Sequence, residues 1–483
     1  TRVKDSTGRL CLLSMAVFGK TLLLVVSVTL VVANAWKDTV EQKQQQQHDP
    51  SGIFDHENYL QPEQIHLSIG EDESQMTVTW LTQSPTNHSI VEFGPKTDVG
   101  VVFTQRVVGN MTLYQDLGSK QRKLYIHRAT LQNLQPGTVH YYHCGDPTWG
   151  WSAVYWFRAL RNDTSFAPRF LIYGDLGNKN GRAVAMLQSE VQTGEVDAVL
   201  HVGDMGYDLA DHNARLADEF FRQLEPISAY VPYQVCPGNH EHHHNFSNYN
   251  ARFSMYNSQQ RSINNHYHSF NVGPVHVVSI STEFYFFLQY GHLQLRHQYE
   301  WLIADLTEAN QKANRAARPW IFLLGHRPMY CTNLDESDCT TSNSIARTGM
   351  PFTHAFALEP LLKKFGVDVY WSGHQHSYER LWPIFNVTVP DRSKDAYVNP
   401  QAPVHIVTGS PGCDEGLTTF GDDPQKISAY HNGENYTFSR VHVANKTHMI
   451  LEQVAVPSGG VIDKITIEKD SLFPKWQQPD LPV

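Results

Sequence analysis

Five short apolar runs in this 483-residue chain are each followed within two residues by a glycine and then by a side chain that can bind a metal ion. Apolar runs that alternate with helical patterns predict buried strands between layers of helices. In open sheets of this kind, ligands bind beyond the carboxyl ends of the strands. We therefore expect the loops to converge on one site after the runs at 170–173, 198–202, 233–236, 321–324 and 367–371.

Each of these strand endings also has an ordinary structural alternative. A Gly-Asp pair after a strand is common in plain turns, and a single histidine there is more often a hydrogen-bonded residue than a ligand. Five such endings in one chain are difficult to obtain as independent accidents, so we interpret them as parts of one metal site. The candidate ligands are Asp175, Asp204, Asn239, His326, His374 and His376.

The blocks around these residues resemble a known family. GDLG at 174–177, GDMGYD at 203–208, GNHE at 238–241, GHRP at 325–328 and GHQHSYER at 373–380 are similar to the signature set of purple acid phosphatases, within the calcineurin-like metallophosphoesterases. Tyr207, three residues after Asp204, narrows the resemblance to the purple branch. The resemblance covers nearly all of residues 61–465. It implies an α/β metallophosphoesterase sandwich, with two mixed sheets flanked by helices, preceded by an all-β fibronectin type III-like domain.

The resemblance also implies a pair of metal ions bridged by Asp204. A hard ferric ion favours anionic oxygen donors, which suits the ligand set Asp175, Asp204, Tyr207 and His376. The second set is mostly neutral and suits a divalent ion such as zinc, ferrous iron or manganese. Its members are Asp204, Asn239, His326 and His374.

The implied activity is that of a secreted acid phosphatase that hydrolyses phosphate monoesters by attack of a metal-bound hydroxide at a dinuclear Fe(III)–M(II) centre. His240 resembles the outer-sphere histidine of the family and is the candidate general acid or phosphate contact. The alternative for His240 is a residue that only orients a ligand. Two other functions stay open, namely a phosphodiesterase or nucleotide hydrolase using the same site, and a secreted adhesion glycoprotein with a vestigial metal site.

Several polar residues near these blocks are expected to have other roles. We interpret His242 to His244 as solvated surface residues, and Glu379 and Arg380 as a structural ion pair or loop anchor. The role of Arg327 is ambiguous. Residues 329–342 contain no histidine where plant relatives carry one that faces substrate, so this loop resembles the animal long-form enzymes and leaves substrate preference open.

The N-terminal region indicates export. Residues 15–20 carry a positive charge, 21–32 are apolar and 33–35 form a small-x-small pattern, which together predict a leader over residues 1–35. Residues 1–14 precede Met15, and we expect them to be upstream sequence that the mature protein does not carry. A membrane anchor is the alternative for the leader, and residues 36–60 are predicted to be a flexible linker.

Export agrees with two further features of the chain. Seven Asn-x-Ser/Thr sequons predict an N-glycosylated protein, secreted or delivered to the lumen of an acidic organelle. Of five cysteines beyond the leader, Cys331 and Cys339 are close enough in sequence to close one loop, and an odd count leaves at least one unpaired or intermolecular.

The pattern of apolar residues divides the rest of the chain into domains. Alternating runs at 61–160 predict a β-sandwich, and the segment 134–142 resembles the tyrosine corner of fibronectin type III modules. Residues 167–400 are the predicted catalytic domain, and 401–468 are predicted to be its C-terminal part. In that part, the alternating runs at 439–444 and 449–454 predict an antiparallel edge. Residues 469–483 are predicted to be a loose tail.

The net charge limits the partners. A formal charge of −10 disfavours nucleic acid, whose binding needs a basic surface. We expect small phosphate esters as substrates and no membrane contact once the leader is removed. The sequence leaves the oligomeric state open.

Overall fold

The computed structural model describes residues 60–98, 100–335, 339, 344–421 and 426–481. They belong to one compact unit, Asn58–Val483. The predicted leader, and the predicted linker except for Leu60, lie outside the described residues. Within the described ranges, no helix is long and apolar enough to cross a membrane.

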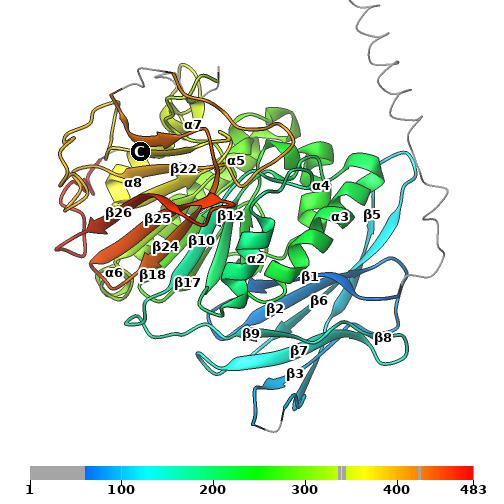
Figure 1. The fold of residues 1–483 in the computed structure, drawn as a ribbon. Helices are drawn as coiled ribbons and strands as arrows, with labels where there is room; N and C mark the ends of the chain where they lie inside the picture. Colours follow the sequence, from blue (N-terminus) through cyan, green and yellow to red (C-terminus); the bar gives the residue numbers. More distant parts are fainter. Residues whose placement is uncertain (1–59, 99, 336–338, 340–343, 422–425, 482–483) are drawn as a thin grey trace, which may run out of the picture. The chain divides into compact units, whose positions relative to one another are not determined.

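The N-terminal part of the described chain forms two antiparallel sheets (Figure 1). The first has the order β1-β2-β6-β5, and its strands are Glu63–Ile69, Met76–Thr82, Lys123–Leu131 and Asn110–Gln115. The second has the order β4-β3-β7-β8 with β9 beside β7, and its strands are Gln105–Val108, Ile90–Pro95, Val139–Asp146, Gly150–Trp151 and Tyr155–Arg158. Their buried side chains, Trp80 and Tyr142 among them, share one hydrophobic cluster. The predicted all-β domain is confirmed.

Two larger mixed sheets follow. The first has the order β14-β12-β10-β24-β25-β26, and its strands are Tyr233–Cys236, Ala198–Val202, Arg169–Tyr173, Tyr436–Val443, His448–Val456 and Val461–Glu468. The second has the order β17-β18-β19-β20-β22-β21-β23, and its strands are His268–Val272, Val275–Ser279, Trp320–Leu324, Val369–Ser372, Val404–Thr408, Tyr378–Leu381 and Ser428–Asn432. Short pairs join β11 to β13 and β15 to β16, at Leu176–Gly177, Met205–Gly206, Tyr256–Asn257 and Ser262–Ile263.

Alternate side chains of these strands point to different cores. Phe170 of β10 and Phe322 of β19 pack together in the cluster between the two sheets. Leu171 of β10 faces the opposite side, in a cluster with α2 and α3, and Ile321 of β19 faces α5 and α8. Because a strand directs successive side chains to opposite faces, both sheets are apolar on both sides, and the layers run helices, sheet, sheet, helices (Figure 1). The predicted fold class is therefore confirmed.

The helices cover the outer faces of these sheets. The α-helices are α2 Val184–Gln192, α3 Asp211–Ser228, α4 His243–Arg252, α5 His292–Ala309, α6 Lys312–Ala317, α7 Ile345–Thr348 and α8 Leu358–Phe365. Short 3-10 turns occur at η1 Asn239–Glu241, η2 Glu283–Tyr285 and η3 Leu288–Tyr290.

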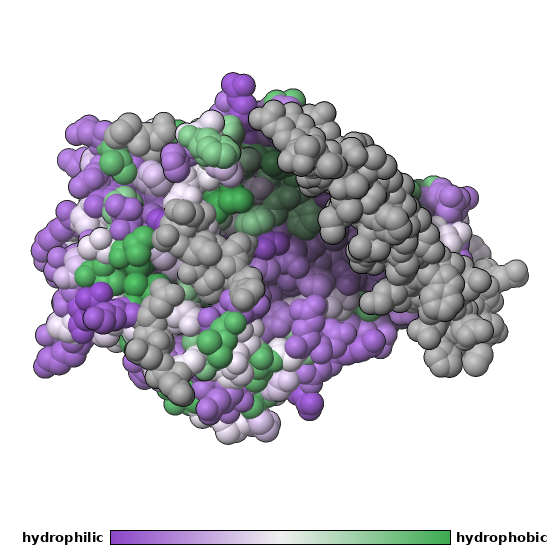
Figure 2. All heavy atoms as spheres, turned by 90° about the horizontal axis from the view of Figure 1, so that it is seen from above, coloured by the Kyte–Doolittle hydropathy of each residue, from purple (hydrophilic) through white to green (hydrophobic). Residues whose placement is uncertain are grey.

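The face of the molecule that lies at the top in Figure 1 carries small separate groups of hydrophobic residues among hydrophilic ones (Figure 2). It also has a hollow with a hydrophobic wall on one side and a hydrophilic wall on the other (Figure 2). Scattered apolar groups of this kind are normal on a folded surface.

One structural prediction needs correction. The hydroxyl of Tyr142 donates to the carbonyl of Ala229 at the end of α3, 2.7 Å away, so this tyrosine does not close a corner within its own sandwich. The tail, predicted to be loose, makes specific contacts in its described part. The carbonyl of Leu472 accepts from Arg315 Nε of α6 at 3.0 Å, and the amide of Gln478 donates to the carbonyl of Lys363 in α8 at 3.1 Å. These contacts satisfy backbone groups of the tail.

A buried charge cluster joins the sandwich to the following domain. Asp218 of α3, with 3% of its side chain exposed, lies 2.7 Å from both Arg122 and Arg252. Gln64 of β1 also donates to its carboxylate at 3.2 Å. Burial alone would raise the pKa of Asp218, but the two guanidinium groups hold it below the ordinary value. Asp218 is therefore an anion that ties elements of both domains together.

Replacing this carboxylate should destabilise the protein strongly. We expect Asp218→Asn to lower the free energy of unfolding by about 3–5 kcal/mol, because Arg252 stays buried without its counter-charge. Guanidinium chloride unfolding followed by tryptophan fluorescence measures the change. Glu195→Gln is the control, since its pair with Arg169 is exposed and should contribute less than about 1 kcal/mol. Equal losses in the two variants would contradict the role assigned to Asp218.

Candidate metal centre

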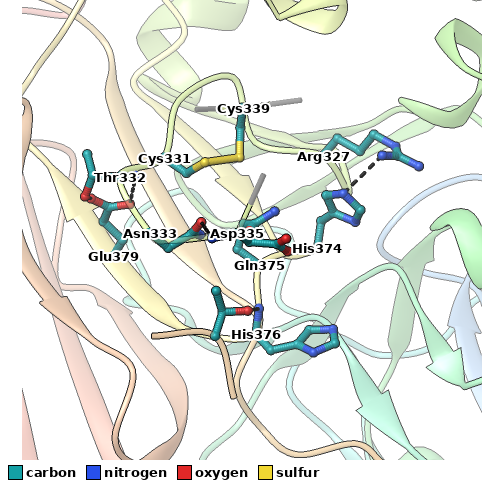
Figure 3. The surroundings of a disulfide bond; sticks show 11 residues. Arg327, Cys331, Thr332, Asn333, Asp335, Cys339, His374, Gln375, His376 and Glu379 are labelled. Carbon is teal, nitrogen blue, oxygen red and sulfur yellow. Dashed lines mark hydrogen bonds between the residues drawn. A yellow bond between two sulfur atoms is a disulfide. The ribbon is translucent and has the colours of Figure 1, made fainter. Parts of the chain in front are cut away.

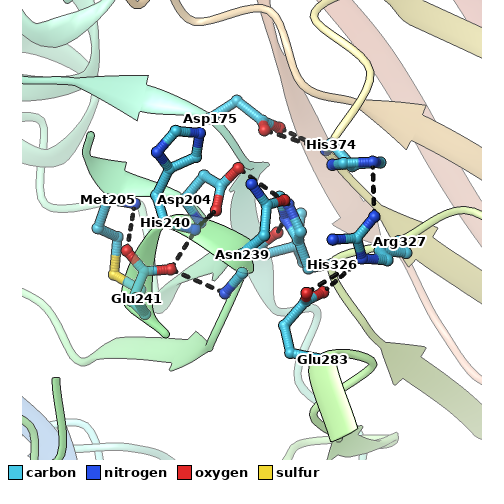
Figure 4. Close-up of polar contacts among 12 residues, drawn as sticks. Asp175, Asp204, Met205, Asn239, His240, Glu241, Glu283, His326, Arg327 and His374 are labelled. Carbon is cyan, nitrogen blue, oxygen red and sulfur yellow. Dashed lines mark hydrogen bonds and ion pairs between the residues drawn. The ribbon is translucent and has the colours of Figure 1, made fainter. Parts of the chain in front are cut away.

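The candidate ligands lie in loops that follow strands of the two mixed sheets, and Figure 4 shows Asp175, Asp204, Asn239, His326 and His374. In the first sheet, Asp175, Asp204 and Asn239 follow β10, β12 and β14, while Tyr207 follows the short strand β13, which pairs with β11. The second sheet supplies those that follow β19 and β20, which are His326, His374 and His376. The site therefore joins both sheets across their shared core.

Three of these side chains form one group. The hydroxyl oxygen of Tyr207 lies 2.7 Å from His376 Nε2 and 3.4 Å from Asp175 Oδ1. His376 Nε2 lies 3.7 Å from the same carboxylate oxygen. A phenol, an imidazole and a carboxylate thus direct one donor atom each to a common point.

A second group lies beside the first. Ligand atoms of Asp204, His326 and His374 all fall within 4.8 Å of one another. His326 Nε2 is 3.0 Å from Asp204 Oδ2 and 3.2 Å from Asn239 Oδ1. These four side chains are the set predicted for the divalent ion.

Backbone contacts connect the two groups. The amide of His374 donates to both oxygens of Asp175, at 3.0 and 2.8 Å. Asp204 Oδ1 accepts from the amide of His240 at 2.9 Å. The seven predicted ligands therefore lie in one continuous set of contacts.

The loops that carry these ligands adopt a conformation that ordinary residues avoid. The φ angles of Asp175, Asp204, Tyr207 and His374 are 62°, 52°, 59° and 68°. Non-glycine residues with positive φ are uncommon, and such strain concentrates at functional sites. The glycines permit close approach, since a Cβ on Gly238 would lie 2.2 Å from Asp204 Oδ1.

The buried acidic groups at this site suit a bound cation. Asp175 and Asp204 are almost completely buried, and burial raises the pKa of Asp175 well above its ordinary value. Burial, with these two carboxylates nearby, also raises the pKa of Tyr207. Burial alone would lower the pKa of His326, but the charge of Asp204 raises it to about 10. Bound metal ions would favour the anionic forms of all three oxygen ligands, so the donor set fits a dinuclear centre.

Glu241 supports the ligands through the backbone, a role that the sequence reasoning missed. Its buried carboxylate accepts from the amides of Asp204, Met205 and Gly238, at 3.0, 2.9 and 2.8 Å. It holds the loops after β12 and β14 together. Its place in the GNHE block was the available signal, but spacing alone does not show that a carboxylate points to backbone amides.

The ambiguous Arg327 also contacts the site. Its Nε lies 3.0 Å from both carboxylate oxygens of Glu283, and its Nη1 lies 3.0 Å from His374 Nε2. The guanidinium group stacks over the ring of Phe286. Arg327 is therefore held rigidly beside a candidate ligand.

His240 lies between two carboxylates. Its Nδ1 is 3.2 Å from Asp208 Oδ1, and its Nε2 is 3.6 Å from Glu415 Oε1. Burial alone would lower the pKa of His240, but the charge of Asp204 and the hydrogen bond to Asp208 raise it to about 10. His242 is less solvated than predicted, because its half-buried ring stacks on Phe287 with centroids 4.4 Å apart, whereas His244 is exposed as predicted.

The loop after β19 has the predicted disulfide (Figure 3). Cys331 and Cys339 are bonded, while the other described cysteines, Cys144, Cys236 and Cys413, are unpaired and buried. Asn333 of this loop donates to Gln375 at 2.6 Å, between the ligands His374 and His376. The disulfide therefore constrains a loop that contacts the site.

Glu379 and Arg380 have the predicted structural roles, but with different partners. The Glu379 carboxylate accepts from the amide and hydroxyl of Thr332, at 2.9 and 2.5 Å. Arg380 pairs with Asp463 through two hydrogen bonds of 2.7 and 2.9 Å. Neither side chain is a ligand candidate.

Replacing Glu241 should weaken metal binding without removing a ligand. An amide cannot accept three hydrogen bonds as a carboxylate does, so Glu241→Gln should reduce the affinity for the divalent ion about 10- to 100-fold. Chelator competition with metal analysis measures this affinity. Glu219→Gln, an exposed change on α3, is the control. Unchanged affinity in Glu241→Gln would contradict the supporting role.

Known proteins resemble this chain over most of its length. Family models match for the purple acid phosphatase N-terminal domain at 62–159, calcineurin-like phosphoesterase at 168–378, and iron/zinc purple acid phosphatase-like protein C at 402–464. Acid phosphatase type 7 from Homo sapiens is 46% identical, covering 84% of this chain and 90% of the relative. The Danio rerio protein of that name is 45% identical, with coverages of 86% and 93%.

Two more distant relatives are also named purple acid phosphatases. Purple acid phosphatase 22 from Arabidopsis thaliana is 32% identical, with coverages of 76% and 76%. Among solved structures, the purple acid phosphatase PPD1 from yellow lupin seeds has a TM-score of 0.68 at 22% identity, covering 85% of this chain and 74% of that one. At that identity the structural likeness supports the fold alone.

Proposed function

This chain belongs to the purple acid phosphatase family of calcineurin-like metallophosphoesterases, and we propose that it hydrolyses phosphate monoesters at a centre of one ferric and one divalent ion. One observation carries the proposal. Seven side chains of the types that such a centre needs lie in one continuous set of contacts, with the Tyr207 hydroxyl 2.7 Å from His376 Nε2.

The proposed ligand sets follow the two groups in the site. The ferric ion would be held by Asp175, Asp204, Tyr207 and His376, and the divalent ion by Asp204, Asn239, His326 and His374. Zinc, ferrous iron and manganese all suit the second set. When bound, the metal pair supplies positive charge for the phosphate and an activated water as nucleophile.

The protein's own groups position the leaving group and supply its proton. His240 Nδ1 faces Asp208 at 3.2 Å, and Nε2 faces the half-exposed side chain of Glu415 at 3.6 Å. The ring of His240 also packs against Tyr207, with centroids 4.4 Å apart. A histidine oriented in this way can donate a proton to the departing alkoxide, which makes it the proposed general acid.

We also propose that the protein is exported and N-glycosylated. The asparagines of six sequons are exposed, and they are Asn87, Asn110, Asn162, Asn245, Asn386 and Asn445. The seventh, Asn435, is half-buried. The Cys331–Cys339 bond also agrees with an oxidising compartment. Glycosidase treatment followed by intact mass measurement tests this proposal.

The colour of the purified protein tests the ferric site. Tyrosinate bound to ferric iron absorbs visible light, so Tyr207→Phe should lose the visible band while its circular dichroism stays unchanged. Tyr256→Phe, in β15 away from the site, should keep the band. A Tyr207→Phe protein that keeps the colour would refute the assignment of this ligand.

The leaving-group dependence of the rate tests His240. With the metal-loaded enzyme, His240→Ala should lower kcat for alkyl phosphates about 10²- to 10⁴-fold, because a poor leaving group needs the proton. The loss on 4-nitrophenyl phosphate should be much smaller, since nitrophenolate leaves without protonation. His244→Ala, at an exposed position, is the control. Equal losses on both esters would contradict the role of general acid.

Relative rates on different ester classes test the substrate. We expect kcat/KM for monoesters to exceed that for diesters such as bis(4-nitrophenyl) phosphate, because a monoester presents more free oxygens to the metal pair. Faster hydrolysis of diesters would favour a phosphodiesterase instead.

A further inference from the structure

Glu415 lies at the solvent-exposed edge of the metal centre and outside the five sequence blocks that carry the family resemblance. Its Oε1 is 3.6 Å from His240 Nε2, and its Oε2 is 3.9 Å from His376 Nε2. The side chain is 53% exposed, whereas that of Asp204 is 2% exposed. Glu415 therefore faces solvent and the site at the same time.

The loop that carries Glu415 is fixed to the site on both sides. Before it, the carbonyl of Cys413 accepts from Asn180 Nδ2 at 2.7 Å, and the Cys413 thiol lies 3.5 Å from His376 Nδ1. After it, the amide of Thr418 donates to the carbonyl of His376 at 2.9 Å. The position of the carboxylate is thus set by the backbone around it.

This position coincides with the expected path of the leaving group. If His240 Nε2 donates a proton to the departing oxygen, that oxygen approaches the nitrogen that Glu415 now faces. The rest of the leaving group must then pass close to the carboxylate. A neutral leaving group meets little opposition there, whereas an anionic one meets a like charge at short range.

We propose that Glu415 is a specificity-determining residue that disfavours substrates with an anionic leaving group, such as pyrophosphate and nucleoside triphosphates, relative to monoesters of uncharged alcohols. The inference rests on the proposed function, because it uses the placement of the leaving group at His240. It adds the substrate class to that function.

Kinetics of the metal-loaded, full-length enzyme test the effect on turnover. In Glu415→Gln, the ratio of kcat/KM for pyrophosphate to kcat/KM for an alkyl monoester, glycerol 2-phosphate, should rise about tenfold, mostly through KM. The rise is limited because solvent partly screens the half-exposed charge. Asp414→Asn removes the same charge from the adjacent exposed residue and should change the ratio less than twofold. An unchanged ratio in Glu415→Gln, or an equal rise in both variants, would overturn the proposal.

Binding measurements separate this inference from the proposed function. Calorimetry with the metal-loaded protein gives dissociation constants for inorganic phosphate and for methylenediphosphonate, which is not hydrolysed. Glu415→Gln should bind methylenediphosphonate about tenfold more tightly, with a smaller change for phosphate. If wild-type protein hydrolyses no ester, the proposed function fails, and these constants still decide the role of Glu415. An unchanged ratio of the two constants would overturn it.

Discussion

The burial of two carboxylates at the meeting point of two sheets is the constraint on which this structure depends. Asp175 and Asp204 lie where water cannot solvate them, and an uncompensated buried charge is costly. Metal ions are the compensation that fits the surrounding phenol, amide and imidazole groups. The left-handed conformations of four ligand residues, and the glycines that allow their close approach, are local costs that the assembled site offsets.

The supporting groups keep this arrangement in place from several directions. Glu241 binds three backbone amides around Asp204, and Glu283 orients Arg327 beside His374. The site draws ligands from both mixed sheets, so it needs the core between them. Phosphoryl transfer needs chiefly positioning and charge neutralisation, and a rigid scaffold around buried charge provides both.

Much of the fold could be predicted from the sequence, because the buried strands are continuous apolar runs. The runs at 198–202 and 233–236 match β12 and β14 in full. The alternating pattern of the β-sandwich does not reveal strands β4 and β5, since their side chains are mostly exposed. The loops could be identified from Gly-Asp and Gly-His endings, and the structure brings all seven proposed ligands together. Glu241 and Glu415 could not be assigned, because their roles depend on three-dimensional direction and not on spacing.

X-ray absorption at the iron edge of the purified protein tests the central claim most directly, since it measures the distances around the metal itself. The account predicts oxygen and nitrogen neighbours in the first shell and a second metal at about 3.5–4 Å from the iron. An iron centre with light-atom neighbours alone, and no metal at that distance, would contradict a pair of ions bridged by Asp204.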